Sequence, residues 1–256
     1  MNGFPDPLAV AEVIREVAQA EILPRFRHLR PEQIREKAPG QIVTDADTAA
    51  EALLVRRLAG LVPAAAVGEE AVAADPGLLA ALETDGPVWV VDPVDGTGNF
   101  VAGDPRFAVI VALVVAGTTV MGWLHDPVAN RTVIAEQGQG AWLGGERLTV
   151  LPEVPLAEMA GSVRRHPALA ARVAAVGRRG SAAHDYLDLV TGQLHFAHFR
   201  RLMPWDHAAG VLVHAEAGGH GALTDGSPYR PVALPGSALL LAPGRRSWDE
   251  LNALIG

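Results

Sequence analysis

The chain has 256 residues, of which 49% are hydrophobic and 20% charged, a balance that predicts one large globular domain or two closely packed halves. Its net charge of −8 argues against a nucleic-acid polymer as the main partner, and the absence of cysteine excludes disulfides, thiolate nucleophiles and cysteine-based metal sites. The N-terminal residues have no basic segment leading into an apolar core, and the longest apolar run (107–116) falls short of the ~20 residues that span a bilayer, so we expect a cytoplasmic protein with no membrane partner.

The beginning of the chain is predicted to be helical and then to alternate with strands. Asp6 and Pro7 are typical of a helix start, and apolar spacing continues this helix to about Leu23. Thr44 is expected to cap a second helix, which Pro63 ends. The other elements expected here are a polar loop at 37–40, a buried strand at 64–67, a short helix at 78–82 and a strand at 88–91.

The middle of the chain is rich in β-forming residues. Runs at 107–115, 119–124 and 131–135 are joined by short turns, which favours antiparallel pairing, and 142–145 is typical of a further hairpin. The proline-containing segment 151–160 predicts a boundary between an N-terminal half (1–150) and a C-terminal half (151–256). In the second half we expect helices at 168–176, 181–190, 205–217 and 248–254, and strands at 194–197 and 238–241.

The apolar run that begins at residue 88 ends in two aspartates and a glycine-rich turn. Asp92 and Asp95 stand three residues apart, and Gly96-Thr97-Gly98 follows at once. Carboxylates suit a hard cation such as Mg²⁺, and glycines beside a hydroxyl let the backbone approach a phosphate closely. Residues i and i+3 of a strand point to opposite sides, but Pro93 is expected to bend the chain so that both carboxylates face one point. The wholly apolar run before them disfavours the alternative, a solvated Asp-Pro turn.

Three further acidic segments are candidates for the same site. Glu69 and Glu70 follow another short apolar run, although adjacent glutamates in isolation indicate a solvated surface. Asp47 lies in the first turn of the helix capped by Thr44, where it could stabilise the helix start or orient a reacting hydroxyl or water. Asp206 opens a helix in the second half, either as a simple N-cap or at a helix end that the small residues after it allow to approach another group closely. A third carboxylate beside Asp92 and Asp95 would complete a site for a hard metal ion.

Together these segments resemble the inositol monophosphatase family. Its signatures are similar to Gly68-Glu69-Glu70, to Asp92-Pro93-Val94-Asp95-Gly96-Thr97-Gly98-Asn99-Phe100 and to Trp205-Asp206-His207-Ala208-Ala209-Gly210, which stand in the family's order. The segments Thr44–Asp47 and Gly180-Ser181-Ala182 and the loop around Lys37 also match. The resemblance implies a layered αβαβα sandwich of the inositol monophosphatase/fructose-1,6-bisphosphatase type, whereas the residue pattern alone indicates only mixed α and β structure.

The resemblance also implies a role for each matching residue. Glu69, Asp92 and the Val94 carbonyl would hold one Mg²⁺, and Asp92, Asp95 and Asp206 a second. A third, weaker ion would contact Glu69 through water. Thr97, paired with Asp47, would help activate the attacking water. The residues implied on the phosphate and substrate side are Asp95, Gly96, Thr97, Gly180, Ser181 and Ala182, with Lys37 and Arg200 as further candidates.

The predicted activity is Mg²⁺-dependent hydrolysis of a small phosphate monoester, by an enzyme that is a homodimer. Phosphatases of the haloacid dehalogenase type also use an Asp-Gly-Thr motif, but with acids two apart, and here Pro93 occupies that position. Inositol-specific members carry a glutamate seven residues before the helix aspartate, where this chain has Phe199. Histidinol phosphate, a sugar phosphate or a nucleotide 3′-phosphate therefore stay open beside inositol phosphate. A non-catalytic, cation-binding regulatory protein is the alternative of a different class.

Overall fold

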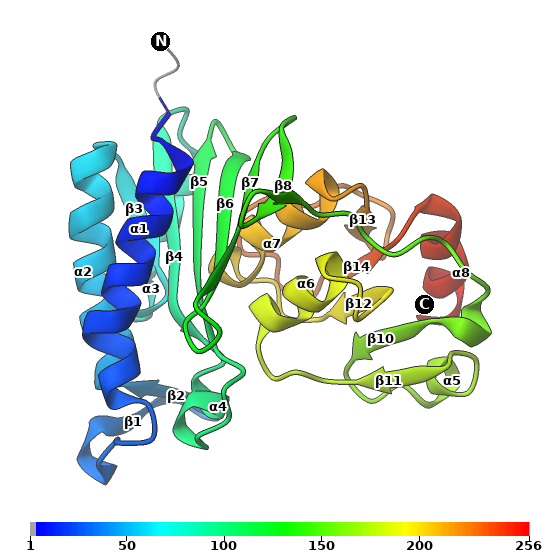
Figure 1. The fold of residues 1–256 in the computed structure, drawn as a ribbon, viewed down its shortest axis with the longest axis horizontal. Coiled ribbons are helices and arrows are strands. Elements are labelled where there is room, and N and C mark those ends of the chain that lie inside the picture. Colours follow the sequence, from blue (N-terminus) through cyan, green and yellow to red (C-terminus); the bar gives the residue numbers. More distant parts are fainter. Residues whose placement is uncertain (1–3, 256) are drawn as a thin grey trace.

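The computed structural model describes residues 4–255 and has the predicted layered, mixed α and β fold (Figure 1). A seven-stranded sheet has the order β3-β4-β5-β6-β7-β8-β9, and a five-stranded sheet has the order β11-β10-β12-β14-β13. The strands of the first sheet are β3 (Ala65–Gly68), β4 (Pro87–Asp95), β5 (Ala108–Val115), β6 (Thr118–Asp126), β7 (Arg131–Glu136), β8 (Gly140–Leu143) and β9 (Glu146–Arg147). Those of the second are β10 (Ala160–Val163), β11 (Ala175–Gly177), β12 (Phe196–Phe199), β13 (His220–Leu223) and β14 (Leu239–Ala242).

Helices cover both sheets and form five layers with them (Figure 1). The helices are α1 (Pro7–Val17), α2 (Asp45–Leu61), α3 (Glu69–Ala74), α4 (Thr97–Val101), α5 (Pro167–Ala170), α6 (Ala182–Val190), α7 (Pro204–Glu216) and α8 (Arg245–Ile255). One apolar core lies between the pair α1/α2 and the seven-stranded sheet, a second surrounds α6 and α7 between the two sheets, and a third joins α5 and α8 to the five-stranded sheet. The predicted αβαβα sandwich is confirmed.

Local sequence signals explain where the first helices begin. The Asp6 side chain accepts a hydrogen bond from the Leu8 amide at 2.9 Å, and Pro7 occupies the first helical position. Thr44 caps α2, and its own amide donates to Asp47 Oδ2 at 2.9 Å in a reciprocal capping box. Both helix starts were predicted.

Three local predictions were wrong. Only the second part of the loop predicted at 37–40 is a turn: Lys37 and Ala38 belong to β1 (Ile34–Ala38), and Pro39 and Gly40 join it to β2 (Gln41–Thr44) in a hairpin. The helix expected at 168–176 stops after α5, because the chain then pairs as β11 with the parallel strand β10. The strand expected at 194–197 lies two residues later as β12, and β10 and β13 were not predicted at all. Their stability comes from pairing with distant strands, which local pattern does not report.

The two sheets draw on consecutive parts of the chain. Strands β3 to β9 lie within residues 65–147, and β10 to β14 lie within 160–242. The division into halves at 150 and 151 stays a prediction about folding units. Among the described residues, no helix is both long and apolar enough to cross a membrane. The prediction that the N-terminal segment is not a signal peptide involves residues 1–3. These residues lie outside the described part of the chain.

Candidate active site

A bulge in β4 turns two aspartates toward the same side of the seven-stranded sheet. Val88 and Val90 face the core around α6 and α7, so alternation sends Asp92 the same way. Asp92 pairs with Ile110 of β5, and Asp95 pairs with Ala108. Between these two pairs β4 advances by three residues and β5 by only two, so β4 contains one extra residue. The extra residue reverses the alternation, so both carboxylates face α6 and α7. The convergence predicted from a proline bend is therefore achieved by a β-bulge that contains the proline.

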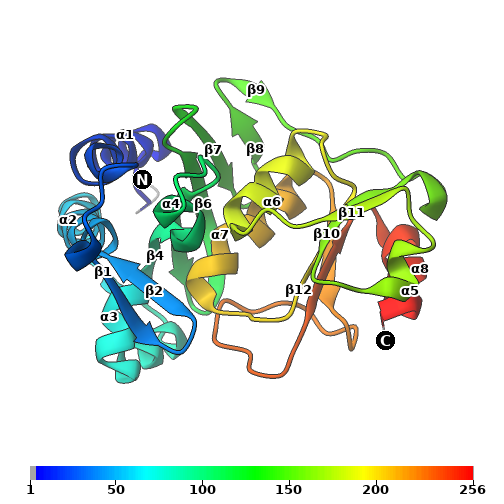
Figure 2. The ribbon, with the colours of Figure 1, turned by 90° about the horizontal axis from the view of Figure 1, so that it is seen from below.

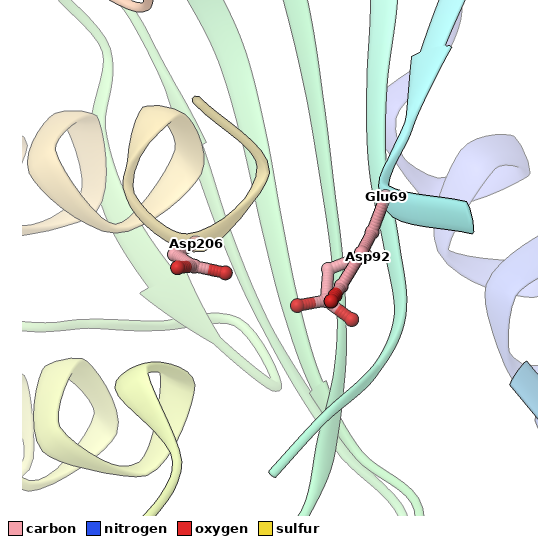
Figure 3. A group of neighbouring side chains, drawn as sticks. All are labelled: Glu69, Asp92 and Asp206. Atoms are coloured by element: carbon pink, nitrogen blue, oxygen red, sulfur yellow. The ribbon is translucent and has the colours of Figure 1, made fainter. Parts of the chain in front are cut away.

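Three carboxylates from separate elements converge beside this bulge. Glu69 begins α3, Asp92 lies in β4, and Asp206 projects from the first turn of α7 across from them (Figure 3). One oxygen atom of each lies within 4.8 Å of the others. Asp206 does not cap its helix, because Met203 is the N-cap residue and no side-chain capping bond is present there. Three oxygen donors at this separation fit a hard cation such as Mg²⁺.

The convergence of these carboxylates is electrostatically unfavourable without positive charge. Removal from water, followed by repulsion from Glu69 and Asp95, raises the pKa of Asp92 well above the usual aspartate value, and the pKa of Asp206 is raised for the same reasons. Lys37 offsets part of the negative charge. Its Nζ lies 2.8 Å from Glu69 Oε1 and 2.5 Å from Glu70 Oε1. Burial acts to lower the pKa of Lys37, but attraction to Glu69 and Glu70 outweighs it and raises that pKa.

Glu51 fixes the segment that carries Glu69, and sequence reasoning missed it. It is buried in α2 and accepts the amides of Glu70 and Ala71, each at 2.8 Å, at the start of α3. Gly68 allows this contact, since a Cβ there would lie 2.3 Å from the Glu51 carboxyl carbon. A glutamate inside a helix of ordinary composition gives no local signal of such a role.

Asp47 both caps α2 and reaches the glycine-rich turn. Its Oδ2 accepts from the Thr44 hydroxyl at 2.6 Å, while its Oδ1 accepts from the Thr97 hydroxyl at 3.1 Å. The Thr97 hydroxyl also lies 3.0 Å from the Val94 carbonyl oxygen, so its single proton is shared between two acceptors. Burial raises the pKa of Asp47, and the hydrogen bonds from Thr44 and Thr97 partly oppose that rise. Asp47 therefore stabilises the start of α2 and also contacts Thr97, and its part in orienting a reacting group stays a prediction.

Asp95 lies next to the carboxylate group of Glu69, Asp92 and Asp206 but is held by α6. Its oxygens accept from the Ser181 hydroxyl at 2.5 Å and from the amides of Ala182 and Ala183 at 3.1 and 2.7 Å. These contacts satisfy the start of α6 and join the two halves of the chain. Ser181 is in turn 3.0 Å from His184 Nδ1. Ser181 Oγ also accepts the His184 amide at 3.2 Å, so the serine is fixed by contacts with Asp95 and with α6.

The four carboxylates predicted to bind metal border one cavity of about 530 Å³, whereas Lys37 and Asp47 do not line it. The cavity is also lined by the turn residues Gly96 and Thr97, by Gly180, and by Arg200 and the half-buried Phe199. Gly96 has φ +89°, and a Cβ there would come within 3.0 Å of the Arg106 carbonyl oxygen, so the turn requires glycine. The Phe199 ring stacks on Tyr186 at 5.3 Å between centroids, and offers no hydrogen-bonding group where an acid was expected.

Comparison with known proteins agrees with this geometry. A model described as the inositol monophosphatase family matches residues 7–255. The chain belongs to the inositol monophosphatase family. It is 38% identical over 235 residues to the inositol-1-monophosphatase of Mycobacterium leprae, which covers 85% of this chain and 79% of that protein. Over 186 residues it is 34% identical to the fructose-1,6-bisphosphatase/inositol-1-monophosphatase of Thermotoga maritima, with 70% of each chain covered.

The fold comparison gives the same assignment. Thermotoga maritima IMPase superposes with a TM-score of 0.83 at 26% sequence identity, over 96% of this chain and 94% of that one. Members of the inositol monophosphatase family are phosphoric monoester hydrolases that depend on metal ions, generally Mg²⁺. This inositol monophosphatase family member is therefore an enzyme, a phosphatase.

The cation-free form of this family member should lose stability as the pH rises. Burial is the main cause that raises the pKa of Asp92 and Asp206, and it raises the pKa of Glu70 and of Asp185 to about 7. These groups hold protons more tightly in the folded state, so the free energy of unfolding falls as the pH rises toward the raised values. One pKa unit is about 1.4 kcal/mol, and each kcal/mol shifts Tm by roughly 2–4 °C. We expect Tm in EDTA to fall by about 3 °C or more from pH 6.5 to pH 8.5.

Scanning calorimetry with and without Mg²⁺ checks this expectation. Cations should replace the lost protons, so Mg²⁺ should raise Tm more at pH 8.5 than at pH 6.5. Burial lowers the pKa of His207 and of His214 to about 4 and 3, and these histidines reduce stability only below their unfolded value of about 6.5, outside this range. A Tm in EDTA that stays constant or rises across the range would contradict the electrostatic account.

Proposed function

We propose that the chain hydrolyses a small phosphate monoester, with Mg²⁺ held at the group formed by Glu69, Asp92 and Asp206, by direct attack of water on phosphorus. One observation carries this proposal: the three carboxylates lie within 4.8 Å in the same cavity as the Thr97 hydroxyl, which bonds to Asp47. Bound cations would neutralise the repulsion between these carboxylates, and the same cations would stabilise the negative charge of a phosphate ester during hydrolysis.

The ligand set follows the family pattern residue by residue. Glu69, Asp92 and the Val94 carbonyl would hold the first ion, and Asp92, Asp95 and Asp206 the second, with a third, weaker ion reached from Glu69 through water. Asp95 fits this role through Oδ1, which accepts only the Ala182 amide and keeps a lone pair, whereas Oδ2 accepts both the Ser181 hydroxyl and the Ala183 amide. When bound, Mg²⁺ offsets the charge of the phosphate and lowers the pKa of a water molecule.

Thr97 and Asp47 form the proton-handling pair. When the Thr97 hydroxyl donates to Asp47 Oδ1, its oxygen lone pairs are free to accept a hydrogen bond from the attacking water. Burial raises the pKa of Asp47, which makes its carboxylate a better proton acceptor than an exposed aspartate. The pair orients the water and takes up its proton, so no covalent enzyme intermediate is required.

Backbone groups would hold the phosphate on the other side. The amides of Gly96 and Thr97 stand at the start of α4, where amides lack intrahelical partners. Gly180, Ser181 and Ala182 line the substrate side of the cavity. Arg200 borders it as well, whereas Lys37 contacts Glu69 and Glu70 and would act on the metal site rather than on the substrate.

The leaving alcohol belongs to a phosphorylated polyol, sugar or related small molecule. Phe199 stacks on Tyr186 where inositol-specific members have an acid, which disfavours myo-inositol phosphate as the natural substrate. Histidinol phosphate and nucleotide 3′-phosphates are the alternative monoesters. A homodimer stays a prediction, which light scattering of the purified protein would check.

Phosphate release from a mixed panel of these monoesters tests the proposal. We expect turnover of at least one substrate in Mg²⁺ and none in EDTA, with activity restored when Mg²⁺ is added back. The same panel distinguishes the non-catalytic alternative, in which the protein binds Mg²⁺ in calorimetry but releases no phosphate. Absence of turnover across the whole panel would overturn the phosphatase proposal.

A further inference from the structure

The hydroxyl of Ser181 lies between a proposed metal ligand and a buried histidine. Ser181 immediately precedes α6, which packs beside α7 and against β5 and β6 (Figure 2). On one side its Oγ donates to Asp95 Oδ2 at 2.5 Å, and on the other it lies 3.0 Å from His184 Nδ1. Asp95, Ser181 and His184 are only 7%, 4% and 6% exposed. Asp95 and Ser181 line the active-site cavity and His184 does not, so His184 can act on the site only through another residue.

The hydrogen bonds at Ser181 determine where its proton lies. A serine hydroxyl has one proton and two lone pairs, and a carboxylate can only accept. When Asp95 is ionised, the Ser181 proton therefore lies in the bond to Asp95 Oδ2. The backbone amide of His184 donates to one lone pair of Ser181 Oγ at 3.2 Å, and His184 Nδ1 faces the other. Nδ1 is consequently the donor in this contact, both in the Nδ1–H tautomer and in the protonated ring.

The other nitrogen of the His184 ring faces a carboxylate that the chain holds in place. Nε2 lies 3.7 Å from Oδ2 of Asp126, the last residue of β6. Asp126 Oδ1 accepts two amides of the following turn, at 3.1 and 3.0 Å, and Oδ2 accepts from Arg131 Nε at 3.2 Å. The His184 ring therefore lies between Ser181 and a fixed Asp126, and a rotation of the ring would break both contacts.

Donation from His184 supports the arrangement that leaves one oxygen of Asp95 for a cation. Asp95 Oδ2 accepts the Ser181 hydroxyl and, at 2.7 Å, the Ala183 amide. Asp95 Oδ1 accepts the Ala182 amide at 3.1 Å and keeps a lone pair. Hydrogen bonds in a chain polarise one another, so a donor to the Ser181 oxygen strengthens the bond from Ser181 to Oδ2. This bond fixes the orientation of the carboxylate, with Oδ1 as the oxygen left over.

We propose that His184 is a positioning residue for the cation that Asp95 binds. His184 Nδ1 donates to the Ser181 oxygen, the Ser181 hydroxyl donates to Asp95 Oδ2, and Asp95 Oδ1 is left to bind Mg²⁺. This inference rests on the proposed function, in which Asp95 is a ligand of the second Mg²⁺. Because His184 does not line the cavity, its effect should appear in the affinity for Mg²⁺ and not in the KM for the phosphate ester.

Calorimetric titration with Mg²⁺ measures this role without any substrate. The variant Asp95→Asn comes first, because it identifies the Mg²⁺ binding step that depends on Asp95. In His184→Leu, we expect the Kd of that step to rise about 3- to 10-fold, the effect of losing one hydrogen bond. At saturating Mg²⁺, the KM for a hydrolysed substrate should stay at the wild-type value. An unchanged Kd for Mg²⁺ in His184→Leu would overturn the proposal.

Two further substitutions of His184 separate its hydrogen bond from its packing. Asparagine can place an amide nitrogen near the position of Nδ1, whereas glutamine places its amide nearer the position of Nε2. We expect His184→Asn to restore most of the wild-type affinity for Mg²⁺ and His184→Gln to resemble His184→Leu. Because His184 is buried, Tm is measured for each variant by circular dichroism. An affinity that follows Tm in all three variants, with no recovery in His184→Asn, would show a merely structural role and overturn the proposal.

A double variant tests whether His184 acts through Ser181. If it does, Ser181→Ala/His184→Leu should bind Mg²⁺ no more weakly than Ser181→Ala alone, because the serine is the only link. Losses that multiply would show a different route and overturn the proposal. His214→Leu is the matched control, since it also removes a buried imidazole from a helix, α7, but at a position that does not line the cavity or contact Ser181. This control should keep the wild-type Kd.

The design also separates failure of this inference from failure of the phosphatase proposal. A protein that releases no phosphate, but shows the expected order of Mg²⁺ affinities in the His184 variants, would support the positioning role and overturn the phosphatase. A protein that releases phosphate with equal Mg²⁺ affinities in all His184 variants would do the reverse. If Asp95→Asn changes no Mg²⁺ binding step, Asp95 is not a ligand, and the role of His184 is overturned whatever the turnover.

Discussion

Asp92→Asn is expected to lower phosphate release about 1,000-fold or more while the protein stays folded. Asp92 is buried, lies in the group with Glu69 and Asp206, and is the one proposed ligand shared by two cations. An amide offers one neutral oxygen in place of a charged pair, so both cations would bind more weakly. The measurement is kcat/KM at saturating Mg²⁺, with Mg²⁺ affinity followed by calorimetry.

The same variant should be more stable than wild type when cations are removed. Wild-type Asp92 is buried and repelled by Glu69 and Asp95, and asparagine removes that charge. The side-chain oxygen of the asparagine can still accept the Val94 amide, which Asp92 Oδ1 accepts at 3.0 Å in the wild type. If the Asp92→Asn variant has a higher Tm than the wild type in EDTA at pH 8.5, the buried Asp92 carboxylate destabilises the cation-free fold. Asp85→Asn, at an exposed position just before β4, is the matched control. It should change neither kcat/KM nor the Tm in EDTA. Near-normal turnover of the Asp92 variant would remove Asp92 from the metal site.

The parts of the site that depend on local sequence could be predicted. Thr44 and Asp47 stand at capping-box spacing, and the structure has that box. Asp92 and Asp95 follow an apolar run and precede a glycine-rich turn, and in the structure both side chains lie on the same side of the seven-stranded sheet. The layer order, by contrast, came from resemblance to a family, because mixed helices and strands are compatible with several layer orders.

The parts that sequence missed depend on contacts between distant segments. Glu51 holds the start of α3 across 19 residues of chain, and nothing near it indicates that role. The three residues of β11 form a strand only because β10 lies beside them. The order of the strands in the five-stranded sheet therefore becomes visible only in the structure.

Thr97→Val should lower kcat about 100- to 1,000-fold with little change in KM. Valine has nearly the shape of threonine but cannot donate to Asp47 or accept from water, so it removes the proton-handling group and keeps the turn. Thr97→Ser keeps the hydroxyl and serves as the matched control, with at least a tenth of wild-type kcat expected. Steady-state kinetics on one substrate, at fixed Mg²⁺, gives both values. Equal activity of the valine and serine variants would show that the hydroxyl has no part in the reaction.

A double-mutant cycle decides whether Thr97 and Asp47 act as one unit. Asp47→Asn also weakens the cap of α2, at a cost of about 1 kcal/mol, so its Tm must be measured beside its kcat. If the Thr97 hydroxyl acts by passing a proton to Asp47, loss of either removes the same step, and Thr97→Val/Asp47→Asn should be little slower than the slower single variant. Independent roles would instead multiply the two losses. That result would separate Asp47 from the reaction and leave it as the residue that caps α2.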